Sequence, residues 1–229
     1  MLSKLVELID INKYYGLKDE KLHALKDVTL TIEQGDFLMI MGKSGSGKTT
    51  LLNLLGLLDR FNNGNYIFNG KDVTNLNENQ RSELRNSYMG FIFQQFHLID
   101  SLTIEQNVEL PMLYKENNKL SKKEKTLHVE KYLDTVGLLN KKKQTPAKLS
   151  GGQQQRIAIA RALINDPYVI FADEPTGALD SETSKDIMNI LKSLNKDNKT
   201  IIMVTHDGDL TRYANKVIHI KDGLVTKVD

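Results

Sequence analysis

The chain has 229 residues, of which 40% are hydrophobic, so it is long enough to bury the core of one large α/β domain or two small ones. Lys and Arg number 31 against 29 Asp and Glu, and this near balance provides no broad basic surface for nucleic acid or anionic lipid. The absence of cysteine excludes disulfides and thiolate metal sites, and it suits a reducing cytoplasm.

The N-terminal part predicts antiparallel strands. Alternating segments at 4–11 and 27–33, and the run GNYIFNGKDV at 64–73, are joined by turns rich in Gly and Asn. The opening MLSKLVELID carries acidic residues where a signal peptide needs an apolar run, so we expect no secretion. We therefore expect an N-terminal antiparallel β subdomain.

Continuous apolar runs predict a second kind of sheet, because strands covered on both faces do not alternate. FLMIM at 37–41, YVIFA at 168–172 and TIIMVT at 200–205 are such runs, and KVIHI at 216–220 resembles them. Helical patterns at 48–58 and 182–195 lie between these strands. The arrangement predicts an α/β fold with a mostly parallel core sheet.

Charged helical sequence replaces the strand signal between about 95 and 165, and it predicts a helical subdomain inserted into one domain that spans 1–229. Basic runs at Lys122–Lys125 and Lys141–Lys143 are interpreted as solvated helix faces and turns rather than polyanion sites. The most apolar stretch, LLNLLGLL at 51–58, is far shorter than the roughly 20 residues of a membrane span. We expect no direct membrane insertion.

A glycine-rich segment directly after the predicted strand 37–41 matches the phosphate-binding pattern G-x-x-x-x-G-K-[ST]. Glycines allow successive backbone N–H groups to wrap a phosphate, and the following helix adds its positive end. The Lys of the pattern reaches the β- and γ-phosphates, and its Thr hydroxyl binds Mg²⁺. The predicted nucleotide-binding residues are Gly42, Lys43, Ser44, Gly45, Ser46, Gly47, Lys48, Thr49 and Thr50.

Two acidic residues at the end of the predicted strand 168–172 supply a second anchor for a metal. Asp173 is predicted to hold Mg²⁺ through its water shell, and Glu174 to polarise the attacking water as general base. The pattern therefore predicts a P-loop NTPase that uses ATP and Mg²⁺.

A second phosphate-binding candidate follows a hundred residues later, in KLSGGQQQRIAIARAL. Ser150 and Gln153 form a capping-box pattern at the start of a helix. Gly151 and Gly152 lower helix propensity there, and they allow close backbone access to an anion. Since the first loop already wraps the phosphates of one ATP, we expect residues 150–153 to bind the γ-phosphate side of an ATP held by a second copy of the chain.

LSGGQ at 149–153 resembles the signature of the ATP-binding cassette (ABC) ATPases, and the other family motifs follow in order over nearly the whole chain. The resemblance implies that Gln94 senses Mg²⁺ and the γ-phosphate, with Gln95 as the alternative. It implies that His206 contacts the γ-phosphate and that Asp180 belongs to a loop linking the two sites. Asp180 also fits a helix N-cap.

The family's upstream aromatic residue stacks on adenine, which the resemblance assigns to Tyr15, with Tyr14 as the alternative. FQQFHLIDSLTIEQNVELP and DEPTGALDS resemble the group that serves macrolide export, lipoprotein release and antimicrobial-peptide resistance. This group often has Pro where Lys43 stands and Ser where Thr49 stands. Lys43 lies at a free position of the phosphate-binding pattern and Thr49 keeps the hydroxyl, so neither change affects the implied catalysis. Asp100 replaces a residue that is commonly Pro, which affects only the assignment to this subgroup.

The implied function is ATP-driven dimer closure that powers a separate integral membrane permease subunit, with the chain peripheral on the cytoplasmic face. The first alternative is a cell-division type of complex in which closure works a membrane protein without moving cargo. The second is a soluble ABC protein acting on DNA or ribosomes, which would need a coiled-coil insertion or a second cassette that 229 residues do not contain.

Overall fold

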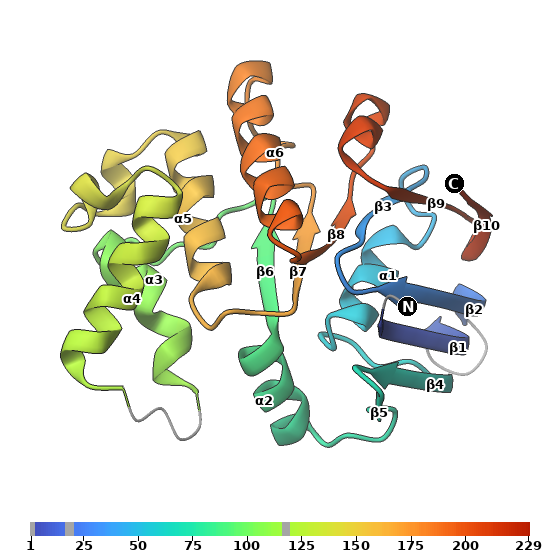
Figure 1. The fold of residues 1–229 in the computed structure, drawn as a ribbon. Helices are drawn as coiled ribbons and strands as arrows, with labels where there is room; N and C mark the ends of the chain where they lie inside the picture. The colour runs from blue at the N-terminus through green and yellow to red at the C-terminus, as the bar shows by residue number, and fades with distance from the viewer. Residues whose placement is uncertain (1–2, 17–20, 116–119) are drawn as a thin grey trace. The chain divides into compact units, whose positions relative to one another are not determined.

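The computed structural model describes residues 3–16, 21–115 and 120–229 (Figure 1). These residues form two compact units. The first comprises residues 1–81 and 195–229, and the second comprises residues 82–194. The chain passes from one unit to the other within helix α2 (Glu78–Tyr88) and near the end of helix α6 (Ser181–Lys196). The prediction of one domain over 1–229 stays a prediction.

The first unit contains the antiparallel sheet that the N-terminal sequence predicts. Its strands are ordered β2-β1-β4-β5, and every pairing is antiparallel. The bounds are β1 Lys4–Tyr15, β2 Leu22–Glu33, β4 Asn63–Phe68 and β5 Lys71–Asp72. Strand β1 is four residues longer than expected, and the extension brings Lys13 and Tyr15 into the sheet.

The same unit contains the parallel strands of the core. Strand β3 (Phe37–Met41) pairs in parallel with β8 (Thr200–Val204) on one side and β9 (Lys216–Lys221) on the other. Strand β10 (Leu224–Val228), which the sequence analysis does not predict, pairs antiparallel with β9. The side chains of Phe37 to Ile40 are 0% exposed, as expected for a strand covered on both faces. Helix α1 (Lys48–Leu55) and the short η3 (Gly208–Tyr213) complete the unit.

The second unit contains the predicted helical segment and two parallel strands, β6 (Met89–Phe93) and β7 (Val169–Asp173). The sequence analysis missed β6, because Gly90 weakens its strand signal. The structure shows why glycine stands there: a Cβ at position 90 would meet the carbonyl oxygen of Ala162 at 2.5 Å.

Three of the helices in this unit begin with a complete capping box, in which the N-cap hydroxyl and the N3 side chain each accept a backbone N–H. The box at Ser150 and Gln153 confirms the predicted helix start. The helices are α3 (Ile104–Leu113), α4 (Lys122–Thr135) and α5 (Gly151–Leu163), with the short turns η1 (Leu139–Lys141) and η2 (Pro146–Lys148) between α4 and α5.

The basic run at 141–143 is paired within the unit. Lys142 contacts Glu130 at 2.5 Å and Lys143 contacts Glu105 at 2.6 Å, while Lys141 donates to the Gln153 side chain at 3.1 Å. Local acidic and amide groups therefore satisfy this run. Across the three described ranges, no helix is both long enough and apolar enough to cross a bilayer.

Candidate nucleotide-binding site

The first phosphate-binding segment lies between β3 and α1. Gly47 is the N-cap of α1, and its φ of 108° lies in the left-handed region that disfavours side chains. A Cβ there would also meet the carbonyl oxygen of Ala24 at 2.8 Å. Glycine at position 47 is thus required both by the backbone conformation and by the neighbouring strand.

Polar groups of this segment suit phosphate oxygens. The Lys48 side chain is mostly buried, and its Nζ donates to the Lys43 carbonyl at 3.0 Å. The Ser46 hydroxyl is buried and has no hydrogen-bond partner among the described residues. Thr49 is exposed in the first turn of α1. A buried hydroxyl and a buried ammonium beside a helix N-terminus fit a polyphosphate chain.

The two candidate tyrosines of β1 have different surroundings. The Tyr14 ring stacks on His23, with ring centroids 4.1 Å apart and an interplanar angle of 19°. Tyr15 is 39% exposed, and its hydroxyl donates to Asp59 at 2.6 Å. Burial, together with the Asp59 carboxylate, raises the pKa of Tyr15, and the Thr50 side chain of α1 acts in the opposite direction. Because it contacts the helix that follows the phosphate loop, Tyr15 is the better candidate for a base platform.

Strand register brings two predicted catalytic residues together in the second unit. Phe93 pairs with Asp173 in the parallel β6–β7 ladder, so Gln94 and Glu174 follow at the same edge. A Cβ on Gly177 would lie 2.9 Å from Gln94 Nε2 and 3.3 Å from Glu174 Oε2. Both side chains therefore lie against Gly177, which favours Gln94 over Gln95 as the site residue.

The Glu174 backbone is unusual, with a φ of 44° at a residue that is not glycine. This conformation turns the chain sharply after β7, directly beyond Asp173. Strained backbone of this kind gathers at functional sites, where surrounding structure enforces it.

The second phosphate-binding candidate forms the N-terminus of α5. Gly151 meets only ordinary contacts, since a Cβ at this position would lie 3.5 Å from the side chains of Phe96 and Leu179. At Gly152, in contrast, a Cβ would lie 2.2 Å from the Thr183 methyl group of α6. Close packing of α5 against Thr183 therefore explains Gly152, a reason that the sequence does not reveal. Gly151 is half-buried and has no comparable close contact.

A hollow of about 320 Å³ lies beside this helix start. Polar and charged side chains of the second unit line most of it. They include Lys141, Ser150, Gln153, Arg156, Thr183 and Asp186.

Two residues of α5 that sequence reasoning missed hold the segment containing Gln94. Gln155 Nε2 donates to the Pro175 carbonyl at 2.6 Å and to the Phe93 carbonyl at 3.3 Å. Arg161 donates to the carbonyl oxygens of Phe96 at 2.8 Å and His97 at 2.5 Å. Burial lowers the pKa of the Arg161 guanidinium. Arg161 stands out in the sequence as a charged residue within the apolar run IAIARAL, whereas Gln155 is one of three consecutive glutamines and carries no such signal.

Asp180 caps α6, as its alternative interpretation predicted. Its Oδ1 accepts the backbone N–H groups of Glu182 at 3.1 Å and Thr183 at 2.9 Å, and its Oδ2 accepts the Thr183 hydroxyl. These hydrogen bonds, the backbone one from Thr183 foremost, lower the pKa of Asp180. His206 lies exposed just after β8 in the first unit.

The predicted site residues thus fall into two groups. The first unit carries Tyr15, His206 and the phosphate segment 42–50, and the second carries Gln94, Asp173, Glu174, Asp180 and the segment 150–153. Within the described part of the chain, His, Asp and Glu form no group of three or more with metal-binding geometry.

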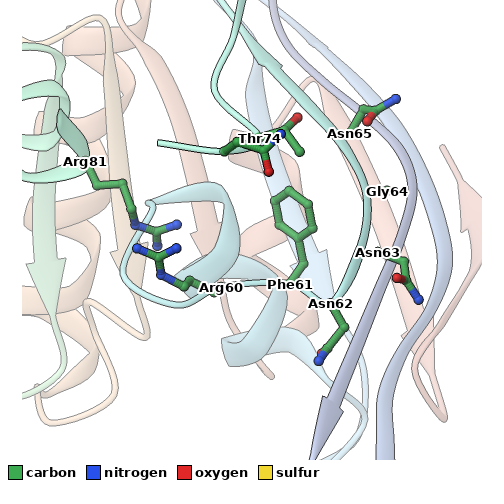
Figure 2. Close-up of a pocket in the computed structure, with 9 residues that line it drawn as sticks. Arg60, Phe61, Asn62, Asn63, Gly64, Asn65, Thr74 and Arg81 are labelled. Carbon is green, nitrogen blue, oxygen red and sulfur yellow. The ribbon is translucent and has the colours of Figure 1, made fainter. Parts of the chain in front are cut away.

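A larger pocket of about 460 Å³ in the first unit has a different lining (Figure 2). Figure 2 shows the Arg60 and Arg81 guanidinium groups close together and the Phe61 ring pointing toward Thr74. The two guanidiniums share Glu78, which lies 2.8 Å from Arg60 and 3.5 Å from Arg81. None of the predicted phosphate-binding residues lines this pocket.

Comparison with known proteins agrees with these motifs. Residues 25–177 match the family described as ABC transporter. An uncharacterised ABC transporter ATP-binding protein of Methanocaldococcus jannaschii is 49% identical over 98% of this chain and 99% of its own length. The macrolide export ATP-binding/permease protein MacB of Neisseria meningitidis is 46% identical over 96% of this chain, which spans only 34% of that relative.

Solved structures give the same result. A dimeric ATP-binding cassette in a post-hydrolysis state, bound to ADP and Pi, is 42% identical and superposes with a TM-score of 0.89 over 98% of both chains. A cassette from Clostridium perfringens that is part of an ABC transporter complex superposes with a TM-score of 0.87 at 30% identity, over 99% of this chain and 88% of its own. The P-loop NTPase fold predicted from the sequence is confirmed. The chain belongs to the ABC transporter family, as an ATP-binding and ATP-hydrolysing subunit.

Proposed function

We propose that two copies of this chain close around two Mg·ATP, hydrolyse them at composite sites and reopen, and that this cycle drives a separate membrane permease. The observation that carries the proposal is the presence of two candidate phosphate-binding elements in one chain, each at the N-terminus of a helix. The segment 42–50 suffices to wrap one triphosphate, so the capped N-terminus of α5 is available for a nucleotide held by a partner copy.

The phosphate-binding part of each site consists of the N–H groups of Gly42–Thr50 and the Lys48 ammonium. Lys48 is held beside the loop by its hydrogen bond to Lys43, so little reorganisation is needed to reach phosphate oxygens. The Thr49 hydroxyl, Asp173 and Gln94 would hold Mg²⁺, which supplies positive charge to the β- and γ-phosphate oxygens. On this proposal Tyr15 stacks on adenine.

For hydrolysis, Glu174 takes the proton of the attacking water as general base. Gln94 lies with Glu174 against Gly177, and on this proposal it orients Mg²⁺ and the γ-phosphate beside the general base. His206 donates a hydrogen bond toward the γ-phosphate, and Asp180 connects the start of α6 to the partner's site. Ser150, Gly151, Gly152 and Gln153 of the second copy contribute the N-terminus of α5.

A substitution at Ser150 tests the composite site. Ser150→Arg removes the capping hydroxyl and adds bulk at an exposed position where the partner's nucleotide would lie. We expect hydrolysis to fall by at least about a hundredfold, while Mg·ATP binding to the single chain changes little. If Ser150→Arg hydrolyses ATP at the wild-type rate and with the same cooperativity, the composite-site proposal is wrong. Ser121→Arg, which disrupts the equivalent capping box of α4, is the matched control.

The permease partner is proposed from relatives such as MacB, whose name joins an ATP-binding part to a permease. This chain spans about a third of that relative, and we propose that its permease partner holds it at the cytoplasmic face of the membrane. Cargo of the macrolide, peptide or lipoprotein type follows from the subgroup resemblance.

A candidate docking segment lies between Gln94 and α3. Buried Asn107 fixes its backbone, because its side chain accepts from Ile99 N and donates to the carbonyls of Ile99, Leu102 and Thr103. Ile99 is 45% exposed, and Leu98 and Leu102 are half-buried. We propose that this segment contacts the permease. Site-specific crosslinking from position 99 in native membranes should capture a membrane subunit, and crosslinking from position 127 on α4 should not.

A further inference from the structure

We propose that Lys13 and Asp59 are positioning residues that hold the Tyr15 ring for stacking on the adenine base. This inference rests on the proposed function, in which Tyr15 is the base platform. All three residues belong to the first unit, and none of the sequence motifs includes Lys13 or Asp59.

Lys13 is fixed in place by two short hydrogen bonds. Its side chain is only 10% exposed, and its Nζ donates to Asp59 Oδ1 at 2.7 Å and to the Arg60 carbonyl at 2.6 Å. The same ammonium lies 4.4 Å from the centroid of the Tyr15 ring. A cation at this distance over an aromatic face makes a favourable cation–π contact, stronger when the cation is desolvated.

Asp59 fixes the other end of the ring. One carboxylate oxygen accepts from Lys13, and the other accepts the Tyr15 hydroxyl at 2.6 Å. The ring is therefore held at its hydroxyl and at one face by the two members of a single ion pair. Tyr15 as a whole is 39% exposed and Lys13 lies over one face of its ring, so the inference assigns the planar base to the opposite face.

The ion pair is better explained by positioning than by stability alone. Lys13 is largely buried and Asp59 is 28% exposed, and such a partly buried pair contributes little net stability, because desolvation of the charges offsets their attraction. An apolar pair of similar size would pack in the same space, yet it would neither orient the hydroxyl nor place a charge against the ring. An aromatic ring with two torsions loses little entropy when fixed, so pre-organisation benefits ligand affinity.

The turn that carries Asp59 is itself held in place. Arg81 is 4% exposed, and its Nη2 donates to the carbonyl oxygens of Leu57 at 2.7 Å and Asp59 at 2.5 Å. Leu57 has a φ of 55°, which bends the chain sharply after α1. Arg81 thereby fixes the backbone from which the Asp59 carboxylate reaches both Lys13 and Tyr15.

The decisive experiment compares a ligand that has a base with one that lacks it. Binding of Mg·ATP and of Mg·tripolyphosphate is measured by calorimetry for the wild-type chain, Lys13→Met and Tyr15→Phe. We expect Lys13→Met to weaken Mg·ATP binding about tenfold, since cation–π and positioning contributions are of that size. Mg·tripolyphosphate binding should change less than about twofold, because the phosphate loop is untouched. Lys4→Met, on the same strand and also in an ion pair, is the matched control and should change neither.

Tyr15→Phe keeps the ring at a partly exposed position and removes only the hydrogen bond to Asp59. It decides the question if Lys13→Met does not fold, and we expect a loss of about threefold for Mg·ATP alone. Equal losses for both ligands, or no loss for ATP, would overturn the positioning role. Tyr15→Ala separates the two hypotheses: weak ATP binding by this variant with normal binding by Lys13→Met refutes only the inference, whereas normal binding by Tyr15→Ala refutes the proposed adenine platform itself.

Discussion

The Gln155 side chain of α5 donates a 2.6 Å hydrogen bond to the carbonyl oxygen of Pro175, the residue that follows Glu174. The same amide nitrogen reaches the Phe93 carbonyl, directly before Gln94. One buried amide thus connects the helix that begins with the signature motif to both chain segments that carry the predicted catalytic residues of the second unit.

Replacing Gln155 by Leu should therefore destabilise the chain and slow hydrolysis. The two carbonyl oxygens would lose their partner inside the protein, which costs about 1–3 kcal/mol. The free energy of unfolding from urea titration, measured beside the ATPase rate, checks this. Gln154→Leu, whose amide makes a longer 3.2 Å contact at a partly exposed position, should have a much smaller effect on both.

Glu174→Gln should separate binding from hydrolysis. The amide keeps the size of the side chain but does not accept a proton, so turnover should fall by about 10²–10⁴. Mg·ATP binding should persist, and in the presence of Mg·ATP the variant should run as a dimer by light scattering. Lys48→Ala should instead lose most binding, because it removes a charge from the phosphate loop. A Glu174→Gln chain that stays monomeric with Mg·ATP, alone and beside its membrane subunit, would contradict dimer closure.

Gly152→Ala tests the packing of α5 on α6. The new Cβ would lie 2.2 Å from the Thr183 methyl group, an end that a β-branched side chain does not move easily. We expect a loss of about 1–3 kcal/mol in the free energy of unfolding.

Thr183→Ser supplies the matched test, since it removes that methyl group and keeps the hydroxyl that bonds Asp180. The double variant should recover much of the loss. If it is no more stable than Gly152→Ala alone, the clash is not the reason for glycine at this position.

The Asp59 carboxyl should contribute to the acid sensitivity of the fold. Burial alone would raise its pKa, but hydrogen bonds from Lys13, Tyr15 and the Arg60 backbone outweigh burial and lower it. A carboxyl with a lowered pKa in the folded state stabilises the fold at pH values above its unfolded pKa of about 4. That contribution is lost as the pH falls through the folded pKa.

Asp59→Asn should accordingly make stability less dependent on pH below about pH 4, although the variant is less stable than wild type at about pH 7. Thermal unfolding of the wild type and of Asp59→Asn between about pH 7 and pH 2.5 measures how steeply the stability of each protein changes with pH. Parallel curves for the two proteins would show that Asp59 does not titrate differently on unfolding. Asp10→Asn, an exposed carboxyl on the same strand as Lys13, is the control.

The local sequence determined the phosphate segment, the N-cap of α5 and most strands and helices, because each depends on a few contiguous residues. A glycine-rich turn between strand and helix, or a Ser three residues before a Gln, needs no distant partner for its conformation. The antiparallel strands near the N-terminus and the continuous apolar strands of the core were likewise predicted from their periodicity.

Only the tertiary structure showed that Tyr15, and not Tyr14, contacts the Lys13–Asp59 ion pair, since Lys13 and Asp59 are 46 positions apart in the sequence. It also revealed strand β6, the contact of Gly152 with Thr183, and the hydrogen bonds of Gln155 across 62 and 20 positions. These features depend on which surfaces meet when the chain folds. Residue type and local spacing carry no direct record of such contacts, because a buried Lys or Gln looks in the sequence like any exposed one.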